Sequence, residues 1–376
     1  MLVWARTRLS LELEHVAASA GVSIEELAKW ESGSTRPGLT QLRKLSRSLH
    51  CTLATLLLPH APPSPRKPHD YRTLPTQQRH PLGLATLLAL RRAYRVVDLA
   101  SQLAEQLGQE ARPIIPRLDS RTDPEVAAQM IREMLGVNVE DQARAPKKPA
   151  VYHRWRLRVE RLGVLVLEAP MPRDECRGFS IYDTHAPTIT VTNEDFPAPR
   201  AFSVLHELAH LSLHVSGLCE VEAPQDAPLP HIEVYCNHVA GAVMVPESAL
   251  LGHPLVRGHS SREWSYDDLE GIGSSFKTSK EVVLRRLLHF GRTSEDFYRK
   301  RRRQWEIDHA NMPDFKPHVT WPRRAFNRNG VGFTSLVLEA ERARAISAHE
   351  AADYLETKQK YLSTIEGHLA DRMYMQ

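Results

Sequence analysis

Long apolar runs are missing from this sequence of 376 residues. A membrane-spanning helix needs a run of about eighteen apolar residues, and the chain contains none. The N-terminal stretch MLVWARTRLSLELEH carries acidic residues where the apolar core of a signal peptide would lie. We therefore expect a cytoplasmic protein with no membrane partner.

Cysteine is also scarce, and the net charge is small. The cysteines form no C-x-x-C pair, so neither a disulfide framework nor a thiolate zinc site is expected. The net charge of +4 does not by itself predict a nucleic-acid partner, and the basic run 299–303 is expected to be a solvated helix face. Four positions are predicted to be small buried apolar residues: Cys51, Cys176, Cys219 and Cys236.

Proline, by contrast, is concentrated at one place and marks a domain boundary. Residues 59–68 read PHAPPSPRKP, which excludes a helix or an inner strand and favours an extended spacer. Elsewhere the composition, 42% apolar and 25% charged, is that of ordinary globular domains. We predict a multidomain protein with an all-α helix-turn-helix domain at 1–58, a linker at 59–80, an α+β domain at 81–260 with its core at 151–250, and a mostly helical region at 261–376.

Residues 2–58 alternate short helical patterns with turns. One helix is expected to end at Gly21, and Ser23 can cap the next helix, with Glu26 completing a capping box. Helix, glycine turn and capped helix is the order of a helix-turn-helix. The segment resembles the Cro/C1-type (XRE-type) repressor domain in Ala17, Gly21, Val22, Ser23, Trp30, Glu31, Gly33 and Pro37.

The expected recognition helix, residues 24–31, has unusual chemistry for a DNA reader. It opens with Ile24, Glu25 and Glu26, and its three glutamates and one lysine give a net charge of −2 that would face phosphate. Two roles stay open for this domain. One is DNA binding, which Glu25 and Glu26 disfavour, and the other is docking or dimerisation with protein.

The stretch FSVLHELAHLSLH, residues 202–214, contains the pattern H-E-x-x-H. On a helix, His206 and His210 stack on one face within reach of a single metal ion, and Glu207 projects beside them. Zinc held by two imidazoles and a third ligand keeps a position for water, from which a glutamate can remove a proton. The pattern therefore predicts a zinc peptidase with Glu207 as its base, and Mn2+ also fits two histidines and a carboxylate.

Several downstream groups could supply the third ligand: His214, Glu220, Glu222, His231, Glu233 and His238. His214 lies roughly 12 Å beyond His206 along a helix axis, so the three histidines cannot meet one ion from a continuous helix. Glu233 fits better, because its segment is expected to form a second core helix with Asn237 on the same face. This resembles the gluzincin arrangement, in which the later residue, here Asn237, orients a zinc-bound histidine. We predict that His206, His210 and Glu233 bind the metal.

Three strands are expected before the H-E-x-x-H helix, at 164–169, 178–183 and 187–193. A small sheet in this position is typical of a zincin, in which an edge strand along the cleft pairs with the substrate backbone. Residues 187–193, rich in β-branched residues with a polar alternate face, are predicted to be that edge strand. Farther on, residues 274–291 resemble the turn and second helix of a helix-turn-helix capped by Ser279, although a plain domain helix is the preferred interpretation.

The motif F-S-V-L-H-E-L-A-H-L, followed by E-x-x-x-N-x-x-A-x-x-x-M-x-P, resembles the ImmA/IrrE family of bacterial and phage metallopeptidases. An N-terminal repressor-like domain, a proline-rich spacer and the segment D-Y-R-T-L-P also look like the longer fused members of that family. The matching downstream residues are Glu233, Cys236, Asn237, His238, Val239, Ala240, Met244 and Pro246.

The resemblance implies an intracellular zinc endopeptidase acting in stress response, mobile-element control or a toxin–antitoxin module. Its expected substrate is a DNA-binding repressor or antitoxin-like protein encoded nearby. Glu207 would deprotonate the attacking water and later protonate the leaving amine, with Tyr182, His231 or Tyr235 as the oxyanion donor. The alternative is a helix-turn-helix transcriptional regulator whose zinc fold serves sensing or docking without proteolysis.

Overall fold

The structure is a computed structural model of the chain. It describes residues 1–62, 82–109, 113–144, 149–173, 175–213, 229–310 and 319–374. These residues form two compact units, the first made of 1–62 with 82–92 and the second beginning at Ala93. Most of the predicted linker lies outside the described residues. Within them, no helix combines the length and the apolar character needed to cross a membrane.

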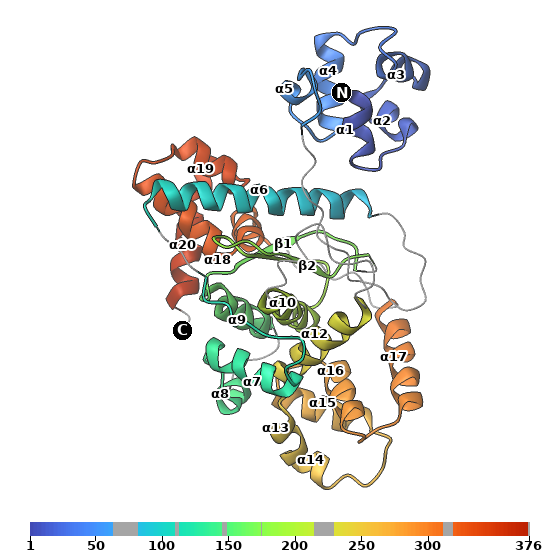
Figure 1. Cartoon of the computed structure of the whole chain (residues 1–376), viewed down its shortest axis with the longest axis vertical. Coiled ribbons are helices and arrows are strands. Elements are labelled where there is room, and N and C mark those ends of the chain that lie inside the picture. The colour runs from blue at the N-terminus through green and yellow to red at the C-terminus, as the bar shows by residue number, and fades with distance from the viewer. Residues whose placement is uncertain are drawn as a thin grey trace. The chain divides into compact units, whose positions relative to one another are not determined.

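The N-terminal unit is a bundle of short helices: α1 (Leu2–Thr7), α2 (Leu13–Ala20), α3 (Ile24–Glu31), α4 (Leu39–Ser48), α5 (Leu53–Leu56) and the start of α6 (Leu84–Gln106) (Figure 1). α2 ends at Gly21, whose φ of 66° is in the left-handed region. The Ser23 hydroxyl accepts a hydrogen bond of 3.1 Å from the Glu26 backbone N–H and so caps α3. Leu27 and Leu45 are fully buried between the helices. The predicted helix-turn-helix order is confirmed.

A three-stranded sheet lies at the centre of the second unit and consists of β1 (Leu165–Ala169), β2 (Gly178–Ile181) and β3 (Thr188–Thr192). The strand order is β1-β3-β2, with β3 parallel to β1 and antiparallel to β2. The register places Leu165 opposite Thr188, and Gly178 opposite Val191. β1 and β3 are buried along their whole length. The predicted small sheet in a mixed α+β domain is confirmed.

β3 is the central strand, so the prediction that residues 187–193 form the edge strand is wrong. The prediction took the threonines of β3 for a solvated polar face, but in the structure they are buried. Thr188 donates a hydrogen bond to the Ala186 carbonyl at 2.8 Å, and Thr192 donates to the Met171 carbonyl at 2.6 Å. A hydroxyl satisfied by backbone can be buried at little cost, so a polar alternate face need not face water.

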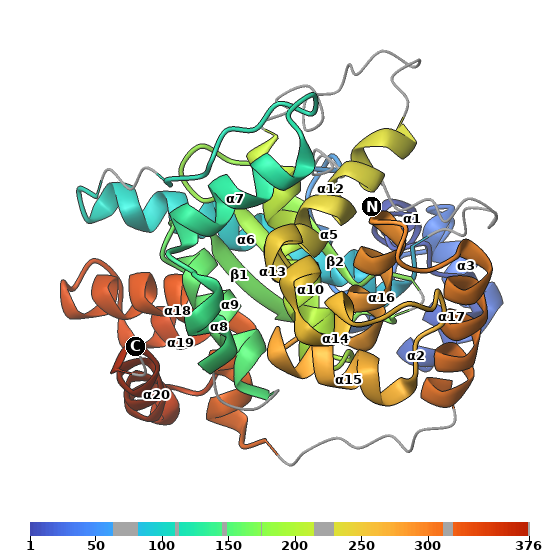
Figure 2. The same ribbon diagram turned by 90° about the horizontal axis from the view of Figure 1, so that it is seen from below.

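Helices cover one face of this sheet, and Figure 2 looks onto them. α10 (Pro197–Ser212) packs on β2 and β3 and contacts both α9 (Pro149–Glu160) and α12 (Leu229–Met244). α7 (Pro124–Leu135) packs on α12. Side chains of these four helices and of the sheet share one hydrophobic core. The H-E-x-x-H segment therefore lies at the centre of the domain.

The C-terminal third of the chain is helical, as predicted. α16 (Lys280–His289) is capped by the Ser279 hydroxyl, which accepts a hydrogen bond from the Val282 N–H at 3.3 Å, and it packs on α12 as a helix of the central core. α18 (Trp321–Arg342) packs along β1 and kinks at Gly330. The other helices of the described residues are α8 (Val139–Arg144), α13 (Glu247–Gly252), α14 (Pro254–Arg257), α15 (Tyr266–Ser275), α17 (Glu295–Ala310), α19 (Ala348–Tyr354), η1 (Gln359–Tyr361) and α20 (Leu362–Tyr374).

Candidate metal centre

α10 is buried on most sides, and its histidines lie together on the remaining face. The helix begins with Pro197 in its first turn, where the missing N–H would have no helical partner. His206 and His210 lie on one face, and their side chains are 12% and 10% exposed. The apolar residues that bury the rest of the helix are Val204, Leu205, Leu208, Ala209 and Leu211.

Three side chains converge at this face. The Nε2 atoms of His206 and His210 are 3.1 Å apart. Glu233, on α12, places Oε2 3.2 Å from His206 Nε2 and Oε1 3.2 Å from His210 Nε2. The structure therefore brings together the three residues that the sequence predicted as metal ligands.

The spacing of these atoms fits a metal ion. Zinc binds histidine nitrogen and carboxylate oxygen at about 2.0–2.2 Å, which puts tetrahedral ligands about 3.3 Å from one another. The separations of 3.1 and 3.2 Å are close to that value. A divalent cation therefore fits between the three ligand atoms.

Charge in the cluster also suits a cation. Burial raises the pKa of Glu233, but its hydrogen bonds to His206 and His210 outweigh burial and lower the pKa to about 2. Burial lowers the pKa of His206, whereas its hydrogen bond to Glu233 and the charges of Glu207 and Glu233 leave that pKa raised. The carboxylate is ionised at neutral pH, so negative charge already faces the two imidazoles.

Glu207 is buried between α10 and the sheet and is 7% exposed. The Ser180 hydroxyl of β2 donates a hydrogen bond of 2.9 Å to Glu207 Oε2. Gly178 lies on the same face of β2, and a Cβ there would stand 3.3 Å from Glu207 Oε1. One strand thus orients the carboxylate through Ser180 and makes room for it at Gly178.

Two matches with known families cover these regions. Residues 159–288 match a peptidase family described as the IrrE N-terminal-like domain, and residues 2–56 match a helix-turn-helix family. The chain joins a region similar to helix-turn-helix domains to a region similar to the IrrE N-terminal-like domain. Both resemblances drawn from the sequence are confirmed. No curated protein matches the chain.

The match to the peptidase domain spans the sheet, α10, α12 and most of α16. It therefore includes His206, Glu207, His210 and Glu233. Peptidases of this family are typically metal-dependent, which agrees with the ligand cluster.

Sequence reasoning missed the support that β2 gives to Glu207 in the peptidase domain. Gly178 and Ser180 alternate with Phe179 and Ile181, and strand periodicity puts the first two on one face. That alternation was the available signal. The partner of this face could not be read from it, because nothing local in the segment points to α10.

The next question is which groups orient the two histidines of the cluster. His206 Nδ1 is buried and has no hydrogen-bond partner among the described residues. Asn237, predicted to orient a metal-binding histidine, lies half-buried on α12 one turn beyond Glu233. Its orienting role stays a prediction.

The three predicted oxyanion donors have different surroundings. Tyr235 is buried, and its hydroxyl donates to the Asp119 carbonyl at 3.3 Å. It is two residues from Glu233 and so lies on the other side of α12. His231 is exposed in the first turns of α12, and Tyr182 is half-buried directly after β2. Tyr182 is thus the candidate that follows the strand supporting Glu207.

The remaining ligand candidates are not at the cluster or are outside the described residues. His238 forms a hydrogen bond of 2.8 Å with Glu125. His214, Glu220 and Glu222 fall in 214–228, outside the described part of the chain, as does Cys219. Cys176 and Cys236 are buried as predicted, whereas Cys51 is half-buried.

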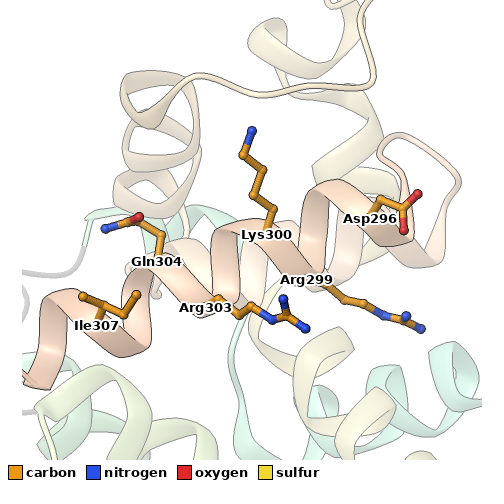
Figure 3. Close-up of a pocket in the computed structure, with 6 residues that line it drawn as sticks. All are labelled: Asp296, Arg299, Lys300, Arg303, Gln304 and Ile307. Atoms are coloured by element: carbon orange, nitrogen blue, oxygen red, sulfur yellow. The ribbon is translucent and has the colours of Figure 1, made fainter.

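The basic run 299–303 divides between two faces of α17. The Arg301 guanidinium lies over the Phe297 ring at 5.1 Å. A hollow along the outer face, drawn in Figure 3, is lined by Asp296, Arg299, Lys300, Arg303, Gln304 and Ile307. Arg299 also pairs with Glu295 at 3.0 Å. Arg299, Lys300 and Arg303 are exposed on this face, as expected of a solvated helix face.

The helix-turn-helix domain presents less negative charge than its recognition segment suggests. Arg6 binds both carboxylate oxygens of Glu31, at 2.8 and 2.9 Å, so that charge is neutralised within the bundle. Glu25 and Lys29 remain exposed on α3, and Glu26 is half-buried. α4 adds further exposed positive charge at Arg43, Lys44 and Arg47.

Proposed function

We propose that the peptidase domain is a zinc-dependent endopeptidase with His206, His210 and Glu233 as metal ligands and Glu207 as general base. The convergence of three ligand atoms 3.1–3.2 Å apart, beside a buried carboxylate, supports this most directly. Mn2+ is the second metal that such a ligand set accepts.

When bound, the ion supplies a Lewis acid that polarises the scissile carbonyl and lowers the pKa of water. The residues of the chain handle the proton. The Glu207 carboxylate takes a proton from the attacking water and returns it to the leaving amine. Ser180 holds one carboxylate oxygen by its hydrogen bond, which keeps the carboxylate in one orientation through both transfers.

The open edge of β2 is the proposed binding site for an extended peptide. The Thr192 N–H donates to the Arg177 carbonyl at 2.9 Å, directly before β2. Hydrogen bonding alternates along an antiparallel pair, so the backbone groups of Gly178 and Ser180 face away from β3. A peptide paired with them would run past Glu207, and backbone pairing of this kind needs little side-chain specificity.

We assign the substrate to DNA-binding repressors or antitoxin-like proteins, in stress response, mobile-element control or a toxin–antitoxin module in the cytoplasm. The support is the helix-turn-helix domain in the same chain, which can bring the peptidase to DNA or to a protein bound there.

The decisive experiment compares wild type with Glu207→Gln. Both are purified, their zinc content is measured, and each is incubated with the repressor encoded beside the gene. We expect zinc near one per chain or above in both, and a loss of cleavage of about 10²–10⁴-fold in the variant. Zinc in both without cleavage by wild type would contradict the peptidase, and absence of zinc from both would contradict the ligand set.

The exposed basic residues of α4 favour a second candidate function, a transcriptional regulator whose zinc fold senses or docks without proteolysis. It requires specific DNA binding by the full chain that is unchanged in Glu207→Gln. Gel-shift titration of both proteins at a stated salt concentration distinguishes it. Cleavage that depends on Glu207 excludes it.

A further inference from the structure

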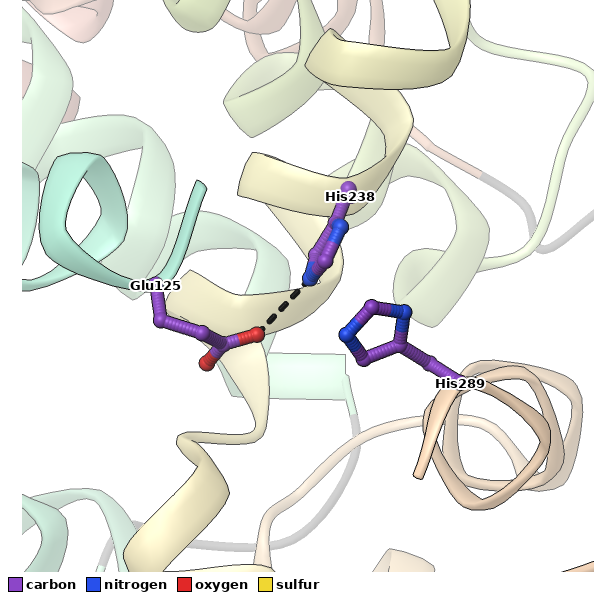
Figure 4. Close-up of side chains that lie close together, drawn as sticks. All are labelled: Glu125, His238 and His289. Atoms are coloured by element: carbon purple, nitrogen blue, oxygen red, sulfur yellow. Dashed lines mark hydrogen bonds and ion pairs between the residues drawn. The ribbon is translucent and has the colours of Figure 1, made fainter. Parts of the chain in front are cut away.

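A second group of metal-ligating side chains lies outside the cluster on α10. Glu125 of α7, His238 of α12 and His289 of α16 converge from three helices (Figure 4). Their ligand atoms all lie within 4.8 Å of one another. Glu125 Oε1 and His238 Nε2 are 2.8 Å apart, and the rings of His238 and His289 have centroids 4.0 Å apart at 63°.

The geometry needs little change to hold an ion. Tetrahedral zinc ligands stand about 3.3 Å apart, so the longest separation has to close by at most about 1.5 Å. His289 is exposed at the end of α16, and its side chain can make that movement without repacking the core. Its exposure also leaves room for water or another small ligand on the ion.

Arg286 is the group that competes with a cation here, because it binds Glu125 through both oxygens. Nη1 lies 2.5 Å from Oε1 and Nη2 lies 2.7 Å from Oε2, while Nε donates to the Val245 carbonyl at 2.9 Å. An ion on Oε1 displaces the Nη1 bond and leaves the bonds of Nη2 and Nε intact. Arg286 then becomes the partner that orients a ligating carboxylate, as metal sites commonly have. Its positive charge would weaken the binding of a cation.

The other charges around the group favour ligand-competent protonation states. Burial raises the pKa of Glu125, but hydrogen bonds from His238 and Arg286 lower it to about 2. Burial lowers the pKa of His289, as do the nearby His238 and Arg286, against the opposing charges of Glu125 and Glu247. An ionised carboxylate and a neutral imidazole are the forms that bind metal.

We propose that Glu125, His238 and His289 bind a second divalent transition-metal ion, with Zn2+ preferred for two imidazoles and a carboxylate. It binds at least tenfold more weakly than the ion at His206, His210 and Glu233, because Arg286 lies against the second carboxylate. Occupancy ties α7 and α16 to α12, the helix that carries Glu233. The site goes beyond the proposed peptidase activity and does not depend on it.

Zinc stoichiometry of the full-length chain tests this. Metal is removed with a chelator, Zn2+ is added over a concentration series, and bound zinc per chain is measured for wild type and variants. We expect two ions in wild type, bound in two steps. His289→Ala should bind one ion and lose the weaker step, while His349→Ala, a matched change of an exposed histidine on α19, should bind two.

His210→Ala distinguishes zinc binding at the cluster on α10 from zinc binding at Glu125, His238 and His289. We expect this variant to lose the tighter step and to keep the weaker one, and the double variant His210→Ala/His289→Ala to bind none. A wild type that binds a single ion, lost in His210→Ala, would overturn the second site. Two ions retained in His289→Ala would overturn it as well. A tighter step that survives His210→Ala would instead contradict the proposed catalytic ligands, whatever His289→Ala shows.

Discussion

The two edges of the central sheet are built in opposite ways. At the β1 edge, the Val166 carbonyl faces away from β3 and accepts a hydrogen bond from Arg156 Nη2, while Arg156 Nη1 binds Glu168 at 2.6 Å and the Asn327 carbonyl at 2.8 Å. At the β2 edge, no strand of the described chain except β3 pairs with Gly178 or Ser180.

The β1 edge is closed by α18. Gly330 kinks this helix with φ 75° and ψ 177°, and the next residue, Val331, donates its N–H to Glu160 Oε1 at 2.8 Å. A Cβ at Gly330 would stand 2.5 Å from the Val166 carbonyl oxygen. One edge is therefore sealed by buried charge and close backbone contact, whereas the edge beside Glu207 has no second strand partner among the described residues and is the edge at which we propose that a peptide pairs.

Among the changes that test the difference between the two edges, removal of Arg156 from the β1 edge should have the largest effect on the free energy of unfolding. The side chains of Arg156, Glu160 and Glu168 are 6%, 2% and 6% exposed, so Arg156→Met leaves two buried carboxylates short of a partner. We expect a loss of about 3–5 kcal/mol in the free energy of unfolding, measured in urea. The matched control is Arg342→Met, which breaks an exposed ion pair with Glu366 and should cost about 0–1 kcal/mol. Equal costs for the two variants would mean that the β1 edge is not held by buried charge.

A methyl group added at Gly330, where α18 kinks, tests the close contact between α18 and the Val166 carbonyl of β1. Gly330→Ala forces a non-glycine residue into a backbone region that is nearly exclusive to glycine, at a cost of about 1–3 kcal/mol before the steric contact is counted. Gly367→Ala is the control, because a Cβ there meets nothing within 4 Å and α20 should gain about 0.5–1 kcal/mol. Thermal unfolding of the three proteins measures both changes. An unchanged melting temperature for Gly330→Ala would show that α18 does not close this edge.

The smallest expected effect lies at the open edge. Ser180→Ala removes a hydrogen bond to an ionised carboxylate, worth about 1.5 kcal/mol, so kcat should fall about tenfold. Zinc content should stay near wild type, the free energy of unfolding should fall by no more than about 1.5 kcal/mol, and Ser180→Thr, which keeps a hydroxyl, should restore most of the rate. A larger loss of stability with an unchanged kcat would indicate a structural role for Ser180 instead.

Local patterns account for much of what the sequence predicted correctly. The cap at Ser23, the turn at Gly21 and the stacking of His206 and His210 depend on residues within about one helical turn, where backbone geometry alone fixes the relation. Glu233 was a less local choice. The structure places its carboxylate 3.2 Å from both histidines, because the apolar periodicity of its segment does mark a second core helix with a carboxylate near its start.

Contacts between distant segments could not be predicted. The threonine alternation of β3 describes either a solvated face or a buried face, and the pairing of both edges of β3 decided for the second. The hydroxyls of Thr188 and Thr192 bind backbone carbonyls there, whereas the Thr190 hydroxyl has no partner among the described residues. Glu125 and His238 are 113 residues apart, and Arg156 meets the Asn327 carbonyl across 171 residues. No periodicity in either segment identifies such a partner.

By itself, the sequence determined the helix-turn-helix order, the small sheet, and the two histidines and glutamate of the H-E-x-x-H helix, because each follows from spacing along one element. The tertiary structure alone decided which strand lies at the edge, which strand supports Glu207, and that Glu125, His238 and His289 meet. The physical reason is that periodicity determines which face of an element is buried, whereas the packing of the whole core determines what that face meets.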